Sequence, residues 1–124
     1  GDDMVPLPRY STVAGVPLAD LMSQEKIDEI VERTRKGGAE IVSLLKNGSA
    51  YYAPGKATSI MVDAILRDTK QIHPTAVMLN GEFGYSDVVS GVPAMIGANG
   101  AEKIIEISLN ETEKEQFYKS VNSV

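Results

Sequence analysis

The sequence predicts an α+β domain in which long helices pack on a largely antiparallel, twisted sheet. Three observations lead to this class. Two long segments with helical periodicity occupy the first half of the chain, and apolar residues alternate in short runs after residue 74. The dipeptide Asn99-Gly100 lies between two of these runs, and Asn-Gly is the strongest short hairpin signal. A three-stranded antiparallel meander between helices is the expected result.

The opening segment, residues 1–18, is expected to be extended. Pro6, Pro8 and Pro17 each lack an amide donor and fix φ, which disfavours a helix. Apolar and polar residues alternate after Tyr10, and this pattern predicts a strand that is kinked at Gly15.

A long amphipathic helix is predicted from Ser23 to Lys46. Ser23 is the expected N-cap, and the stop signal is Lys46-Asn47-Gly48. The adjacent Gly37 and Gly38 cost about 2 kcal/mol relative to alanines in a helix interior. We therefore expect either a kink at these two glycines or another backbone packed closely against them.

A second helix is predicted from Ser49 to about Asp68, with Pro54 and Gly55 in its first turn or at a kink. Residues 69–73 are expected to be a linker. Strands are then predicted at Thr75–Asn80, Val88–Ile96 and Lys103–Leu109, and Gly91 and Pro93 suggest a bulge or an edge position in the second. Asn110 and Glu113 have the spacing of a capping box and predict a terminal helix.

Composition is that of a soluble globular domain, and we expect residues 1–124 to form one domain. The chain is 43% hydrophobic and 23% charged, with a net charge of −5 that argues against a nucleic-acid partner. No apolar run reaches the roughly 20 residues that cross a bilayer. The absence of cysteine fits a cytoplasmic location and excludes thiolate metal sites.

Few residues offer chemistry on their own. His73 is the only histidine, and with no nearby carboxylate spacing or nucleophile motif we interpret it as structural. Asp2 and Asp3 are adjacent on an extended segment, so their side chains point to opposite faces and do not converge on one proton or ion. The chain has no nucleotide-binding glycine motif and no expected metal site.

Three segments together resemble the lactate/malate dehydrogenase family, and within it the lactate-dehydrogenase-like malate dehydrogenases of bacteria. They are Gly-Asp-x-Met-Val-Pro-Leu at the start, Asn-Gly-Ser-Ala-Tyr-Tyr-Ala-Pro-Gly-Lys-Ala in the middle, and the strand-loop-strand run Gly-Glu-Phe-Gly-Tyr-Ser-Asp-Val-Val-Ser-Gly-Val-Pro-Ala-Met-Ile-Gly-Ala-Asn-Gly. Each motif is weak alone, but the three occur in the family's order and spacing. The resemblance covers nearly the whole chain and implies the family's C-terminal domain, with the NAD-binding Rossmann domain and the end of the last helix outside this sequence.

The resemblance implies an NAD-dependent dehydrogenase that reversibly oxidises malate to oxaloacetate, a reaction of the tricarboxylic acid cycle. The family's catalytic histidine would immediately precede Gly1, so no catalytic residue is expected in this chain, and the chain alone is expected to be inactive. By the same resemblance Asp2 positions the catalytic loop, and Ser49 and Ala50 belong to the substrate pocket. The positions expected to face the cofactor are Met4, Val5 and Pro54.

The same resemblance implies a homodimer or homotetramer, with malate or oxaloacetate as the small dicarboxylate substrate. Two alternatives stay open from the sequence. One is a lactate dehydrogenase C-terminal domain, and the other is a non-catalytic binding or oligomerisation domain of the same fold.

Overall fold

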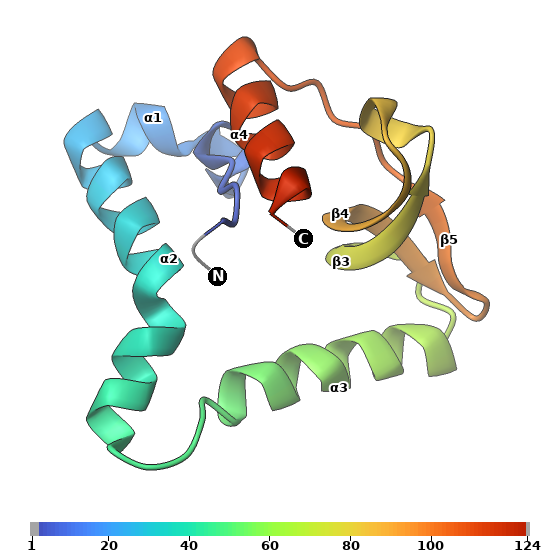
Figure 1. Cartoon of the computed structure of the whole chain (residues 1–124), viewed down its shortest axis with the longest axis horizontal. Coiled ribbons are helices and arrows are strands. Elements are labelled where there is room, and N and C mark those ends of the chain that lie inside the picture. The colour runs from blue at the N-terminus through green and yellow to red at the C-terminus, as the bar shows by residue number, and fades with distance from the viewer. Residues whose placement is uncertain (1–2, 124) are drawn as a thin grey trace. The chain divides into compact units, whose positions relative to one another are not determined.

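The computed structural model describes residues 3–123, and their helices and strands are shown in Figure 1. The chain forms two compact units, one built from Gly1–Ala50 together with Asn110–Val124 and the other from Tyr51–Leu109. Each unit is described by itself below. The α+β class is confirmed, since helices α1 to α4 are combined with strands that pair only in antiparallel fashion in the described part of the chain.

The first unit opens with a short 3₁₀ turn and a tight hairpin. The turn η1 (Pro8–Tyr10) leads into β1 (Thr12–Val13), which pairs with β2 (Val16–Pro17). Ala14 and Gly15 form the two-residue loop with φ values of 51° and 85°. The prediction of one strand kinked at Gly15 was therefore wrong, because two successive left-handed residues reverse the chain completely.

Helix α2 (Gln24–Leu45) confirms the predicted long helix, and the four-residue helix α1 (Leu18–Leu21), which was not predicted, precedes it. The Ser23 hydroxyl accepts the Lys26 amide at 3.4 Å, as expected for an N-cap. No kink or close backbone occurs at Gly37 and Gly38, since α2 is continuous and a Cβ at either position would meet no described atom within 4 Å.

Helix α4 (Glu111–Asn122) begins with the predicted capping box. The Asn110 side chain accepts the Glu113 amide at 2.9 Å, and the Glu113 carboxylate accepts the Asn110 amide at 2.8 Å. Its buried residues share one face at four-residue spacing: Glu113, Phe117 and Val121.

The second unit begins with α3 (Tyr52–Leu66), whose third residue is Pro54. Pro54 therefore lies in the first turn, as the sequence predicted, where its missing amide costs no helical hydrogen bond. The buried face of α3 packs on β4 (Ser86–Gly97) through a small cluster of apolar side chains: Ala64, Ala94, Ile96 and the partly buried Val77.

The predicted three-stranded meander is confirmed, in the order β3-β4-β5. Strand β3 (Gln71–Asn80) begins earlier than expected, so most of the segment interpreted as a linker belongs to the sheet. Pro74 does not prevent this, because β3 is an edge strand of the three and can lack an amide on its open side. The hairpin at Asn99-Gly100 is confirmed, with Gly97 paired to Gly100.

The interpretation of Gly91 and Pro93 as a bulge or an edge was wrong. Strand β4 is central, and both residues pair in regular register with β3. The irregularities lie elsewhere, where Asp87 (φ 59°) and Glu102 are left without a partner in the pairing of their strands.

Strand β5 (Gly100–Ile104) ends well before the predicted limit at Leu109. Pro93 supplies a physical reason. Its carbonyl accepts the Ile105 amide at 2.8 Å, but proline has no amide to return the second bond of that pair. The ladder therefore stops at the point where its partner strand has no donor.

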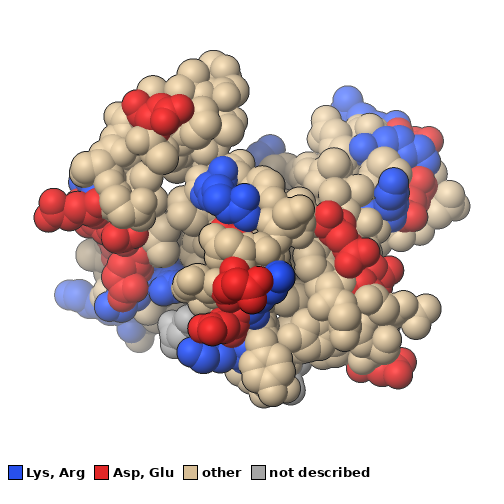
Figure 2. All heavy atoms as spheres, turned by 90° about the horizontal axis from the view of Figure 1, so that it is seen from above, with Lys and Arg blue, Asp and Glu red and all other residues tan. Residues whose placement is uncertain are grey.

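Acidic and basic side chains lie next to each other on the face shown in Figure 2. Along α2, exposed ion pairs join Lys26 to Glu29 and Lys36 to Glu32, both at 2.7 Å. Helix α2 therefore has a solvated face on which charges of both signs are paired.

Candidate functional site

The two predicted substrate-pocket residues lie in the connection between α2 and α3. Ser49 is exposed and Ala50 is partly buried. The connection follows Lys46, which ends α2 with a φ of 62°, and Gly48 has a φ of 99°. These two left-handed residues turn the backbone out of the helix and present Ser49 and Ala50 on irregular chain.

The predicted cofactor-facing residues come from two places. Met4 and Val5 lie in the extended opening segment, where Met4 is 38% exposed and Val5 is partly buried. Pro54 is exposed in the first turn of α3 and belongs to the second unit. Asp2, predicted to position the catalytic loop, lies outside the described residues. The described positions are therefore divided between the two units, with Pro54 in the second and the others in the first.

These side chains suit one part of a dinucleotide only. Met4, Val5 and Pro54 are apolar and at least partly accessible, which fits contact with the flat nicotinamide ring. They offer no donor or cation for the phosphates, so those groups would need other residues.

His73 lies within β3, opposite Ala94. Its Nε2 atom is buried and has no hydrogen-bond partner among residues 3–123. No group placed to exchange a proton with that nitrogen is found there, which agrees with a structural interpretation. The strand position differs from the connection that the sequence suggested.

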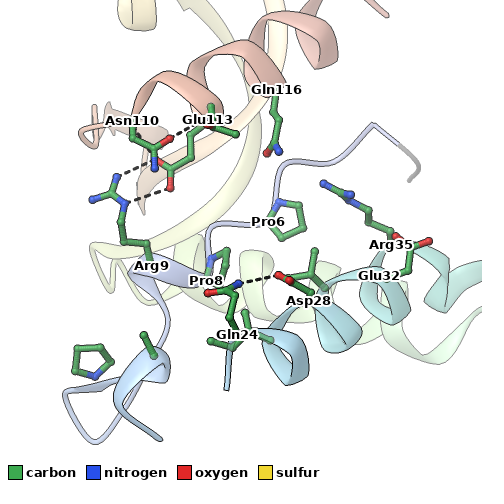
Figure 3. A pocket seen from close by; sticks show the side chains of 15 residues that line it. Pro6, Pro8, Arg9, Gln24, Asp28, Glu32, Arg35, Asn110, Glu113 and Gln116 are labelled. Atoms are coloured by element: carbon green, nitrogen blue, oxygen red, sulfur yellow. Dashed lines mark hydrogen bonds and ion pairs between the residues drawn. The ribbon is translucent and has the colours of Figure 1, made fainter. Parts of the chain in front are cut away.

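A pocket of about 860 Å³ lies entirely within the first unit, and Figure 3 shows it from close by. It is bordered by the opening segment, the region from β2 into α2, and the first turns of α4. None of the predicted site residues lines it. Its lining consists of Pro6, Pro8, Arg9, Pro17, Ala19, Gln24, Ile27, Asp28, Val31, Glu32, Arg35, Asn110, Thr112, Glu113 and Gln116.

The central polar contact of the pocket joins Arg9 to Glu113, as Figure 3 shows. Arg9 Nε donates to Glu113 Oε1 at 3.2 Å, and Arg9 Nη2 donates to Glu113 Oε2 at 2.8 Å. This is the two-point geometry that a guanidinium and a carboxylate favour. The Arg9 side chain also lies over the Tyr10 ring, 4.6 Å from its centroid.

The environment of Glu113 favours its charged form. The Arg9 hydrogen bonds, and then the Asn110 amide, lower the pKa of the Glu113 carboxyl against the opposing effect of burial. The hydrogen bond with Glu113 raises the pKa of Arg9 in turn. Glu113 is only 8% exposed, so its charge is held in place by named partners rather than by bulk water.

The other polar groups of the pocket are arranged along α2. Gln24 Nε2 donates to Asp28 Oδ1 at 2.7 Å, and Glu32 pairs with Lys36. Arg35 has a buried Nε without a hydrogen-bond partner in the described part of the chain. These contacts stabilise α2. They provide no pair of a nucleophile and a base.

Residues 3–123 contain no cluster of three or more His, Asp or Glu side chains able to hold a metal ion. None of the helices in that range is long and apolar enough to cross a membrane.

Sequence reasoning missed Arg9 and, in part, Glu113. The capping box was visible because its two members are three residues apart. Arg9 lies 104 residues before its partner, and no local pattern connects positions so far apart.

Comparison with known proteins identifies the class of fold. The structure matches malate dehydrogenase from Salinibacter ruber with a TM-score of 0.96 and 49% identity, over 99% of this chain and 40% of that one. It matches lactate dehydrogenase from Eimeria maxima, solved with NADH and oxamate, with a TM-score of 0.95 and 39% identity, over 99% of this chain and 40% of that one. The fold is therefore that of a dehydrogenase C-terminal domain.

Residues 1–124 match the family described as lactate/malate dehydrogenase, alpha/beta C-terminal domain. The chain belongs to this family, as its three motifs indicated. It is 76% identical to malate dehydrogenase from Sulfurimonas denitrificans over its whole length. It covers 39% of that relative, so it spans about two fifths of the length of the curated proteins it matches.

Proposed function

We propose that the complete protein is an NAD-dependent malate dehydrogenase that interconverts malate and oxaloacetate, to which this chain contributes the C-terminal domain. The observation that carries the proposal is the 76% identity to a malate dehydrogenase along all 124 residues. Identity at that level preserves side chains as well as fold, whereas fold alone would leave the reaction open.

Within this proposal the chain supplies walls of the site rather than its proton-transfer group. The catalytic histidine is expected immediately before Gly1, and Asp2 would position the loop that carries it. Ser49 and Ala50 would border the substrate, and Met4, Val5 and Pro54 would contact the nicotinamide. NAD, when bound, takes up the hydride from the hydroxyl-bearing carbon of malate.

The accessibility of these residues supports the assignment. Small, uncharged side chains at Ser49 and Ala50 leave room for a dicarboxylate and set no opposing negative charge beside it. Carboxylate recognition would come from arginines outside this sequence.

We further propose that the enzyme is cytoplasmic and acts in the tricarboxylic acid cycle.

A symmetric homodimer or homotetramer is part of the same proposal. Helix α2 has an apolar stripe of which only Ile27 is buried. Four apolar side chains in its second half are exposed by 40% or more: Ile41, Val42, Leu44 and Leu45. Such a surface on a folded protein marks an interface that another domain or subunit covers.

The test uses the complete protein and measures NADH formation from NAD and malate, with lactate as the competing substrate. We expect turnover with malate to exceed turnover with lactate by at least about tenfold, a difference that pocket contacts can supply. Preferential turnover of lactate would instead identify the protein as a lactate dehydrogenase. Absence of both activities, in protein that is folded by circular dichroism, would support a non-catalytic binding domain. The 124-residue chain alone is expected to show no turnover.

A further inference from the structure

The opening segment is held rigidly on its C-terminal side. Pro6 and Pro8 fix φ at two of its positions. The turn η1 is closed by the Tyr10 amide on the Leu7 carbonyl and the Ser11 amide on the Pro8 carbonyl, both at 2.9 Å. A displacement of Arg9 is therefore transmitted along the backbone toward Met4 rather than absorbed by a flexible loop.

Glu113, the partner of Arg9, is also held in place by hydrogen bonds. Glu113 accepts both guanidinium bonds and the Asn110 amide, while its own amide is bound by the Asn110 side chain. The carboxylate therefore cannot follow Arg9 without breaking the cap of α4. The two carboxylate oxygens also fix the plane of the guanidinium, which a single ion-pair contact would not do.

We propose that Arg9 and Glu113 are positioning residues, which set the path of residues 4–8 by fastening the η1 turn to the first turn of α4. This inference rests on the proposed function, because Met4 and Val5 of this segment are there expected to contact the nicotinamide. Neither side chain needs to touch a reactant. Their effect is to hold the backbone that carries Met4 and Val5 in one place.

The first test is Arg9→Met in the complete protein, with Arg33→Met as the matched control. Arg33 also donates two bonds to one carboxylate, Glu40, at 3.2 and 3.0 Å, but both residues lie on α2. We expect Arg9→Met to lower kcat/KM for malate by about ten- to a hundredfold, the scale expected when a reacting group is misplaced by about 1 Å. Arg33→Met should stay within about twofold.

Two further readouts separate positioning from a general loss of stability. In Arg9→Met the amides of Tyr10 and Ser11, which close η1, should exchange with deuterium at least about tenfold faster than in the parent, while amides of the sheet are unchanged. Arg9→Lys keeps the charge but not the two-point geometry, and it should restore less than half of the lost activity. Glu113→Gln keeps a capping-box residue and should reproduce the exchange effect.

The outcomes are distinguishable from those of the proposed function. Unchanged exchange at Tyr10 and Ser11 in Arg9→Met overturns the positioning role whether or not the parent oxidises malate. If exchange is faster in Arg9→Met but its kcat/KM stays within about twofold of the parent value, Arg9 does not affect the active site. If exchange is faster in Arg9→Met than in the parent, but the parent itself does not oxidise malate, the fastening role is supported and the proposed function is overturned.

Discussion

The carboxylate of Asp68 accepts a hydrogen bond from the backbone amide of Ala98 at 2.8 Å, across 30 residues of chain. Lys70 lies beside it and pairs with both Asp68, at 3.0 Å, and Glu102, at 2.5 Å. Glu102 in turn accepts the Asn99 amide at 3.2 Å. The connection after α3 is therefore fastened to the β4–β5 hairpin, and Gly97 lies directly beneath the two carboxylates.

Gly97→Ala should destabilise the domain. A Cβ at Gly97 would lie 2.6 Å from Glu102 Oε1 and 2.7 Å from Asp68 Oδ1, so these two carboxylates must shift from the positions in which they bind amides. We expect a loss of about 1 kcal/mol, measured by thermal or denaturant unfolding, because the clash moves two side-chain ends and weakens the hydrogen bonds that they accept. Gly91→Ala is the matched control on the same strand. A Cβ there would meet nothing within 4 Å, so that variant should be neutral, and equal losses in both variants would contradict the argument.

The same cluster should contribute to pH dependence. Hydrogen bonds from the Ala98 amide and from Lys70 lower the pKa of Asp68 below its ordinary 3.8, and those from Lys70 and the Asn99 amide lower the pKa of Glu102 below 4.5. A depressed folded-state pKa adds stability that is complete above the unfolded-state value and is lost as the pH falls through the folded one. Lys70→Met should therefore lower Tm at pH 7 by more than it does below pH 3.8. A pH-independent difference would show that Lys70 acts through packing.

His73→Gln in the complete protein should leave kcat/KM within a few-fold of the parent. His73 lies inside β3 with a buried, unpartnered Nε2, and no acid or base among residues 3–123 is placed to exchange a proton with it. A thousandfold loss in variant protein with an unchanged circular dichroism spectrum would contradict this.

Ala50→Leu tests the substrate-facing assignment. Added bulk at a partly buried position beside the proposed pocket should raise KM for oxaloacetate, while the dissociation constant for NADH changes little. Ala101→Leu, the same change at an exposed position of β5, should alter neither constant. Wild-type values of both constants in Ala50→Leu would remove Ala50 from the pocket.

The elements that could be predicted from sequence are those whose signals are local. The cap at Ser23 and the capping box of Asn110 and Glu113 involve neighbours within one helical turn, and both were confirmed. The end of β5 could not be predicted, because it depends on Pro93 in the strand opposite. The pairing of Arg9 with Glu113 likewise arises only when the two ends of the chain meet in one unit. Alternating patterns show which residues can form a strand, but the partner decides where pairing stops.

Gly37 and Gly38 lie on a part of α2 that could contact a second copy of the protein. A Cβ at either glycine would meet no described atom within 4 Å, and neighbouring apolar side chains, including Ile41 and Val42, are exposed. Two glycines in a helix interior cost about 2 kcal/mol relative to alanine, and no contact in the described chain offsets that cost. We therefore expect a second copy to approach this surface in a symmetric homo-oligomer of the complete protein.

Gly38→Leu should have opposite effects on the stability of α2 and on the formation of the oligomer. In the folded monomer it should raise helix stability, since leucine is the better helix former and meets no described atom within 4 Å. In the oligomer it should obstruct the close approach, so light scattering should show dissociation at higher protein concentration than in the parent. Glu25→Leu, in the first turn of the same helix, controls for added apolar surface away from the proposed interface. A parent protein that is monomeric at micromolar concentration would remove the oligomer, and an unaltered dissociation curve for Gly38→Leu would place its contact elsewhere.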